Sequence, residues 1–145
     1  MAFYSAMAVA DYIIDFCSRI KEPVSNLRLQ KLLYFAWVDF YRETGESLFY
    51  DSMYAWQLGP VVPEVYNEYC SYGGRPINLR WESTEIEQKD ADILGRIIEK
   101  YRLVPVSVLV DKTHKPETAW YQVYNEGKGN KQRIPTDLIK KKEFG

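Results

Sequence analysis

The pattern of apolar and polar positions predicts a helix near the start of the chain. Between Ser5 and Lys21 the apolar side chains recur every three or four residues and share one helical face: Ala6, Val9, Ala10, Ile13, Ile14, Cys17 and Ile20. Pro23 ends this helix, because proline cannot continue the helical hydrogen-bond ladder.

A second helix is predicted from Ser25 or Asn26, either of which can cap it, to about Thr44. Gly45 supplies the C-terminal stop. Apolar residues cover most of the circumference of this helix. That pattern is typical of a central helix that packs on several sides.

One narrow polar stripe remains on the second helix, and Phe35 lies in the middle of it. The stripe is formed by Arg28, Lys31, Asp39 and Arg42. Two interpretations of Phe35 stay open. Either the stems of long Arg and Lys side chains cover the ring, or the ring is an aromatic anchor on a surface that faces a partner.

Two extended segments are predicted after the second helix. Residues 48–58 read as an extended stretch with a turn near residues 51–52, and Trp56 and Leu58 are expected in the core. Further along, Ile77, Leu79 and Trp81 alternate with polar residues, which is a strand pattern. We expect residues 77–81 to pair with residues 53–56 in a small antiparallel sheet.

A tight joint connects the first extended segment to a helix. Gly59 and Pro60 force a turn, because glycine permits unusual φ values and proline fixes φ. Pro63 opens a helix that reaches about Tyr72, at a position where its missing N–H costs nothing. We expect Gly59, Pro60 and Val61 to set the chain direction, with any partner contact at the exposed turn.

The second half of the chain predicts more helices. Thr84 and Glu87 form a capping box that starts a helix to about Arg102. Residues 104–110 fit either a strand or a helix opened by Pro105, and periodicity does not decide between them. Helices are also expected at residues 117–125 and 136–144, with a flexible loop at residues 127–131.

Length and composition fit one compact domain over residues 1–145. The chain is 46% hydrophobic and 27% charged, and its net charge of −1 argues against duplex DNA or an anionic membrane as a dominant partner. No apolar run approaches the roughly 20 residues that span a bilayer. Since the first residues also lack the features of a signal peptide, we expect a cytoplasmic protein.

The aromatic residues, the cysteines and the single histidine indicate which partners and metal sites the chain can have. Twelve tyrosines, four tryptophans and six phenylalanines fit an aromatic core as well as an interaction surface, so assembly into homo-oligomers stays open. Cys17 and Cys70 are expected to be buried free thiols. The single histidine, His114, excludes a histidine metal cluster, and we expect neither a metal nor a cofactor.

No residue pattern predicts catalysis. Residues 127–129 lack the spacing and context of a phosphate loop. His114 has acidic neighbours in sequence, but no pattern supplies a nucleophile for it to activate. Its expected role is a hydrogen bond to the backbone at a helix end. The lysines at 140–142 are expected to form a solvated helix end, which disfavours a nucleic-acid site.

Several motifs follow one another along nearly the whole chain: residues 9–14, residues 26–36, Thr44-Gly45 with Leu48-Phe49, residues 55–66, Thr113-His114 with Trp120, and Ile134 with Phe144. In this order they resemble the Panacea antitoxin domain, a family that includes SocA-like antitoxins and phage-associated GepA-like proteins. The structural signature consists of Leu32, Tyr34, Trp56, Thr113 and Trp120. One departure is that the usual Pro-Trp of the family is Ala119-Trp120 here.

The resemblance implies a mainly α (α+β) fold, a multi-helix domain with a small antiparallel sheet or hairpin, and it favours a helix at residues 104–110. It also implies a protein that is not an enzyme but an antitoxin of a type II-like toxin–antitoxin system, often in a prophage. Such an antitoxin binds and neutralises a toxin from the adjacent gene. In the SocA-like branch, the resemblance implies delivery of the toxin to a Clp-type protease.

On this hypothesis the candidate partner-binding residues share a place on the polar stripe, in the joint or in the histidine motif. They are Arg28, Lys31, Phe35, Asp39, Gly59, Pro60, Val61 and His114. A membrane partner is not expected, and nucleic acid is disfavoured.

Overall fold

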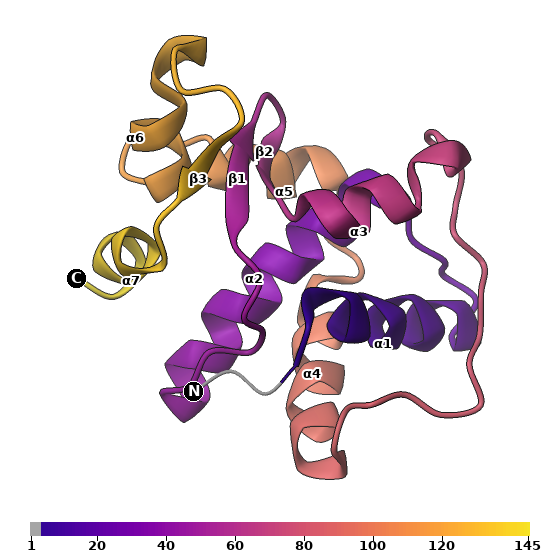
Figure 1. The fold of residues 1–145 in the computed structure, drawn as a ribbon. Helices are drawn as coiled ribbons and strands as arrows, with labels where there is room; N and C mark the ends of the chain where they lie inside the picture. The colour runs from indigo at the N-terminus through magenta and orange to yellow at the C-terminus, as the bar shows by residue number, and fades with distance from the viewer. Residues whose placement is uncertain (1–3) are drawn as a thin grey trace.

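Helix α2 (Asn26–Thr44) runs through the middle of the structure, and the other elements gather around it (Figure 1). The computed structural model describes residues 4–145. In it α2 contacts α1 (Ala6–Arg19), α3 (Pro63–Glu68), α4 (Gln88–Tyr101), α5 (Val106–Thr113), α7 (Thr136–Phe144) and strand β2 (Gly59–Val61). The prediction of a central helix from its apolar circumference is confirmed.

Short polar side chains begin the first two helices. The Ser5 hydroxyl accepts the Ala8 N–H at 3.1 Å, and the Ser25 hydroxyl accepts the Arg28 N–H at 3.2 Å. Gly45 ends α2 with a left-handed φ of 74°. Each cap satisfies a backbone group that a helix end leaves unpaired, so the predicted starts of both helices and the predicted end of α2 are confirmed. Helix α1 ends at Arg19, before the predicted Lys21.

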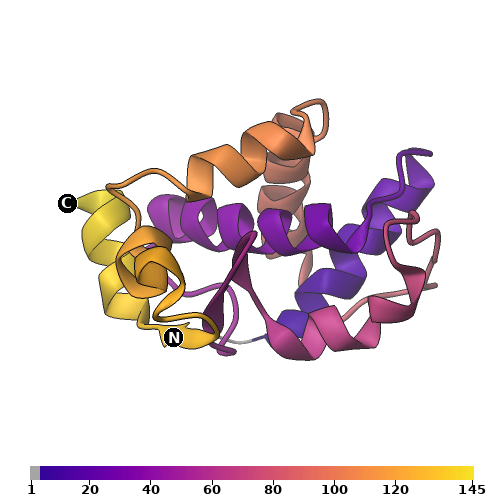
Figure 2. The same ribbon diagram turned by 90° about the horizontal axis from the view of Figure 1, so that it is seen from above.

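A three-stranded antiparallel sheet lies against α2. Its order is β2–β1–β3, with β1 at Met53–Trp56 and β3 at Gln132–Ile134. Figure 2 shows the β1–β2 hairpin running toward α2, and α5 lying along the same helix. Because β2 is an edge strand, Pro60 can stand in it without removing a ladder hydrogen bond. The prediction of a mainly helical fold with a small antiparallel sheet is confirmed.

The predicted partner of β1 is wrong. Residues 77–81 form no strand in the described part of the chain, and an isolated bridge joins Ile77 to Val24. Side chains of α1 take the backbone groups instead. The Asp15 carboxylate accepts the Trp81 N–H at 2.8 Å, and the Ser18 hydroxyl accepts the Leu79 N–H at 3.2 Å. The N–H groups of Ile77, Leu79 and Trp81 therefore find partners without a sheet.

The predicted capping box is also wrong, because a tertiary contact takes its place. Helix α4 begins at Gln88, and the Tyr4 hydroxyl accepts the Glu87 N–H at 3.1 Å. The same hydroxyl donates to Asp90 at 2.5 Å. Residues 106–113 are helical, which confirms the prediction drawn from the family resemblance. Cys17 is buried as expected, but Cys70 is exposed.

The last part of the chain closes the sheet and covers α2. Helix α6 (Ala119–Tyr124) and a 3₁₀ turn (Asn125–Gly127) lead to β3, and α7 then packs on α2. The Tyr34 hydroxyl donates to the Glu143 carboxylate at 2.5 Å, and Tyr41 stacks on Phe144. Among residues 4–145, no helix has the length and apolar character needed to cross a bilayer.

Gly59 occupies the tightest position in the hairpin. Its φ is 121°, which L-residues with side chains rarely adopt. A Cβ added there would lie 2.7 Å from Lys31 Nζ and 2.8 Å from Thr113 Oγ1. Both the backbone conformation and the space therefore require glycine.

We expect Gly59→Ala to lower the free energy of unfolding by about 3 kcal/mol, since it adds a steric clash to backbone strain. Gly45→Ala is the matched control, because Gly45 also has a positive φ but has nothing within 4 Å of the added Cβ. That variant should lose about 1 kcal/mol. Urea unfolding measures both, and equal losses would show that the close approach is not the constraint.

Candidate functional site

The motif residues of α2, the hairpin and α5 converge on one interior site. We call Lys31, Pro60, Thr113, His114 and Trp120 the hairpin anchor. Lys31 is 0% exposed, and its Nζ donates to the Pro60 carbonyl oxygen at 2.9 Å. Its predicted place on an exposed polar stripe is therefore wrong, because the hairpin covers this part of α2.

The environment of Lys31 changes its titration. Burial lowers the pKa of the Lys31 ammonium from 10.5 to about 7. None of the ion pairs formed within residues 4–145 includes Lys31. The polar partner of the Lys31 amine is thus a backbone carbonyl. Near pH 7 a substantial fraction of Lys31 carries the neutral amine.

An aromatic stack forms the second half of the hairpin anchor. The His114 ring stacks on Trp120 with centroids 4.0 Å apart, and Trp120 stacks on Tyr124 at 4.6 Å. Trp120 Nε1 donates to the Trp56 carbonyl oxygen at 2.7 Å. This hydrogen bond ties α6 to β1, and it brings together two signature residues, Trp56 and Trp120, that are far apart in sequence.

His114 lies close to Lys31, and none of the ion pairs formed within residues 4–145 includes His114. Burial lowers the pKa of the imidazole, the nearby Lys31 ammonium lowers it further, and the Leu58 backbone and the Asp111 charge partly oppose both effects. His114 Nε2 is buried, and no group in residues 4–145 hydrogen bonds to it.

The contacts in this arrangement attach the hairpin to α2 and α6. The Thr113 hydroxyl donates to the Val110 carbonyl at 2.8 Å, so its proton is committed to helix α5. No nucleophile–base hydrogen bond joins Thr113 to His114 in the described chain. A group of three or more His, Cys, Asp or Glu side chains suited to a metal is likewise not found within residues 4–145.

A pocket lies on another side of the hairpin. It has a volume of about 290 Å³, and its walls come from the start of α2, the hairpin tip and the end of α3. We call it the tip pocket, and its apolar and aromatic walls are Leu27, Trp56, Leu58, Val61, Tyr66 and Cys70. Its remaining lining residues are Asn26, Gln30, Gln57 and Gly73, so no charged residue lines it.

The residues at the hairpin tip have the opposite exposure from the predicted one. Leu58, expected in the core, is 51% exposed, whereas Gly59, Pro60 and Val61 are buried. The reason is that β2 lies directly on α2, so the turn presents Gln57 and Leu58 to solvent. Sequence reasoning missed Leu27, Leu58, Tyr66 and Cys70 as surface residues. The sequence did contain a signal for the exposure of Leu58, because this apolar residue directly precedes Gly59, the glycine of a turn.

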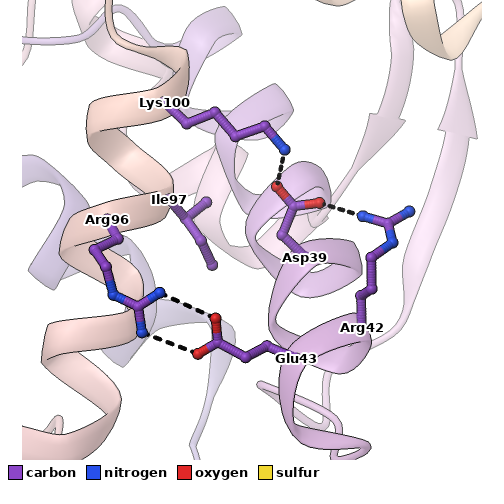
Figure 3. A pocket seen from close by; sticks show the side chains of 6 residues that line it. All are labelled: Asp39, Arg42, Glu43, Arg96, Ile97 and Lys100. Atoms are coloured by element: carbon purple, nitrogen blue, oxygen red, sulfur yellow. Dashed lines mark hydrogen bonds and ion pairs between the residues drawn. The ribbon is translucent and has the colours of Figure 1, made fainter.

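The rest of the polar stripe faces α4. Phe35 stacks on Tyr101 with centroids 5.1 Å apart, so an aromatic ring of α4 packs against it. Asp39 pairs with Arg42 and Lys100, and it accepts the Tyr101 hydroxyl at 2.8 Å. Figure 3 shows these pairs together with a two-pronged contact between Glu43 and Arg96. We use the name charged seam for the cluster of Asp39, Arg42, Glu43, Arg96, Ile97 and Lys100.

Arg28 lies apart from both the hairpin anchor and the charged seam. It lines a shallow pocket of about 220 Å³ together with Cys17, Glu22 and Arg102. The candidate residues are therefore distributed over three regions, and the structure does not bring them into one contact surface.

The pH dependence of stability should report the buried amine. The pKa of Lys31 in the folded protein lies below its ordinary value, so between those two pH values the unfolded chain binds more protons. Stability then rises with pH. We expect the free energy of unfolding, measured in urea, to increase by about 1 kcal/mol from pH 7 to pH 8.

Lys31→Met should flatten this increase, because it removes the titrating amine and keeps a long side chain. Lys112→Met, on the exposed side of α5, should keep the wild-type slope. His114 titrates below this range because its pKa is lowered from 6.5. Burial raises the pKa of Cys17 from 9.0 to about 11, so its opposing effect comes at higher pH. A slope that persists in Lys31→Met would contradict the assignment.

Comparison with known proteins agrees with the motifs that form this site. The family profile described as "Antitoxin SocA-like, Panacea domain" matches residues 29–121, a range that contains the whole hairpin anchor. The chain is 32% identical over 132 residues to Antitoxin SocA of Caulobacter vibrioides (strain NA1000 / CB15N), across 83% of this chain and 70% of that protein. No solved structure matches. By the extent of these two matches, the chain belongs to the SocA-like Panacea domain family.

Proposed function

We propose that this protein is an antitoxin that neutralises the toxin of an adjacent gene by binding to it directly. The observation that carries the proposal is family membership, through the profile match over residues 29–121 and the identity to a protein named as an antitoxin. Direct binding and genetic adjacency go beyond these matches.

The geometry supports a role in binding over a role in chemistry. The polar groups of the hairpin anchor are turned inward, where Lys31 and Thr113 donate to backbone carbonyls. The exposed features nearby are apolar and aromatic, as in the core of a protein–protein interface. We therefore assign no catalytic step to neutralisation.

A second candidate function, delivery of the toxin to a Clp-type protease, is favoured by the separation of two unlike surfaces. The tip pocket reaches Gln30 on α2, and the charged seam begins at Asp39, nine residues further along the helix. At 1.5 Å per residue these residues are about 14 Å apart. An adaptor needs one surface for its cargo and another for the protease, and this arrangement meets that requirement.

Co-expression tests the proposed function. We expect the adjacent open reading frame to arrest growth when it is expressed alone, and this protein to restore growth and to co-purify with its product. A neighbour that is harmless, or that stays toxic beside this protein, would contradict the proposal. Restored growth in a host without Clp protease would support masking, and its loss there would support the adaptor.

The role of His114 is tested in the same assay. His114→Phe removes both ring nitrogens but keeps a flat ring to stack on Trp120. We expect full neutralisation by this variant. Loss of neutralisation with an unchanged melting temperature and unchanged toxin binding would point to chemistry at the imidazole.

A further inference from the structure

The tip pocket has the properties of a receptor for one apolar side chain. Its volume of about 290 Å³ is just below the range of about 300–1,000 Å³ for small-molecule sites, so it suits a single large side chain. No charged residue lines it, although 27% of the chain is charged. A charged occupant would therefore lose hydration without gaining a partner.

The side chains of Asn26 and Gln30, two of the polar residues in its lining, are already hydrogen bonded within the protein. Asn26 donates to the Tyr66 carbonyl at 3.0 Å, and Gln30 donates to the Asn26 side-chain oxygen at 3.1 Å. Gln30 also accepts the Val62 N–H at 3.0 Å. These bonds hold the two amides in place, so the pocket offers its apolar walls to an occupant.

The walls are held in position before any partner arrives. Trp56 meets Tyr66 edge to face with centroids 5.0 Å apart, and the Trp56 carbonyl is fixed by Trp120. On the inner side, Lys31 secures the β2 strand that follows the tip. A preformed pocket avoids part of the ordering cost of association.

A positive charge stands beside these walls. Lys131 Nζ lies 5.3 Å from the centroid of the Trp56 ring. Lys131 is exposed, and it takes part in none of the ion pairs found within residues 4–145. A partner that places a carboxylate next to its apolar anchor would match both features at once.

We propose that the tip pocket is the toxin-docking site, which receives one large apolar side chain of the toxin while an adjacent acidic residue of the toxin pairs with Lys131. This inference rests on the proposed function. A second copy of this chain is a poorer occupant, because Leu58 would have to leave the wall of its own pocket to fill the pocket of a symmetric partner.

Cys70 reports on the occupancy of the pocket without any substitution. It is exposed in the pocket wall, whereas Cys17 is buried and the pKa of its thiol is raised to about 11. Iodoacetamide should therefore label Cys70 much faster than Cys17, as followed by mass spectrometry. In the purified complex with the toxin, we expect the labelling rate of Cys70 to fall at least tenfold.

Two variants test the apolar and the charged contacts separately. Leu58→Asp and Lys131→Glu should each weaken toxin binding at least tenfold with an unchanged melting temperature. Leu103→Asp and Lys142→Glu are matched controls, because Leu103 is 76% exposed and both positions lie outside the pocket lining. These controls should bind like the wild type.

The outcomes distinguish a failure of the proposed docking site from a failure of the proposed function. If the wild-type protein neither binds nor neutralises the toxin, the proposed function fails. If it does both while Cys70 stays reactive in the complex and Leu58→Asp binds normally, the docking site is wrong and the function stands. If Cys70 becomes protected in the protein alone as its concentration rises, a second copy fills the pocket and the proposal is overturned.

Discussion

The hydrogen bond from Lys31 to the Pro60 carbonyl holds the central helix and the hairpin together in the interior. An amine in this position needs both a carbonyl oxygen and space. Pro60 supplies the oxygen, and Gly59 supplies the space because it has no Cβ. Since a buried lysine without a carboxylate is costly when it is charged, the site favours the neutral form. The short tripeptide Gly59–Val61 is thereby committed to one conformation and one neighbour.

The exposed surface of the hairpin depends on this interior contact. With β2 held on α2, the turn directs Leu58 outward, the Trp56 ring meets Tyr66, and the Trp56 carbonyl oxygen accepts the indole N–H of Trp120. The tip pocket is therefore lined mainly by residues of the motifs at residues 26–36 and 55–66, whereas Lys31 and Pro60 of the hairpin anchor are buried. In the proposed docking site, substitutions at Leu27 and Leu58 would change the pocket wall without touching the hairpin anchor.

The sequence predicted those features that depend on local chemistry. Ser5, Ser25 and Gly45 mark helix ends through short-range hydrogen bonds and backbone freedom, and the structure has these ends where they were expected. The strand at residues 77–81 and the capping box at Thr84 were wrong for a common reason. Side chains from distant helix α1 and from Tyr4 satisfied their backbone groups, and such tertiary partners leave no trace in local periodicity.

The candidate site was only partly predictable for the same physical reason. Sequence reasoning selected the anchor residues Lys31, Pro60 and His114, but as candidate contacts for a partner. Helical spacing assigns a residue to a face, but it does not show whether a hairpin or another helix covers that face. Phe35 illustrates the point, because its polar neighbours suggested solvent whereas Tyr101 of α4 lies over the ring.

The arrangement of the sheet has a consequence for the order of events during synthesis. Strand β1 lies between β2, which follows it almost at once, and β3, which begins at Gln132. A chain emerging from the ribosome completes the hairpin early, but one edge of β1 has no partner until some 75 further residues have been made. During that interval the open edge is available to any other extended segment. The newly made protein is thus exposed to incorrect strand pairing until β3 has been made.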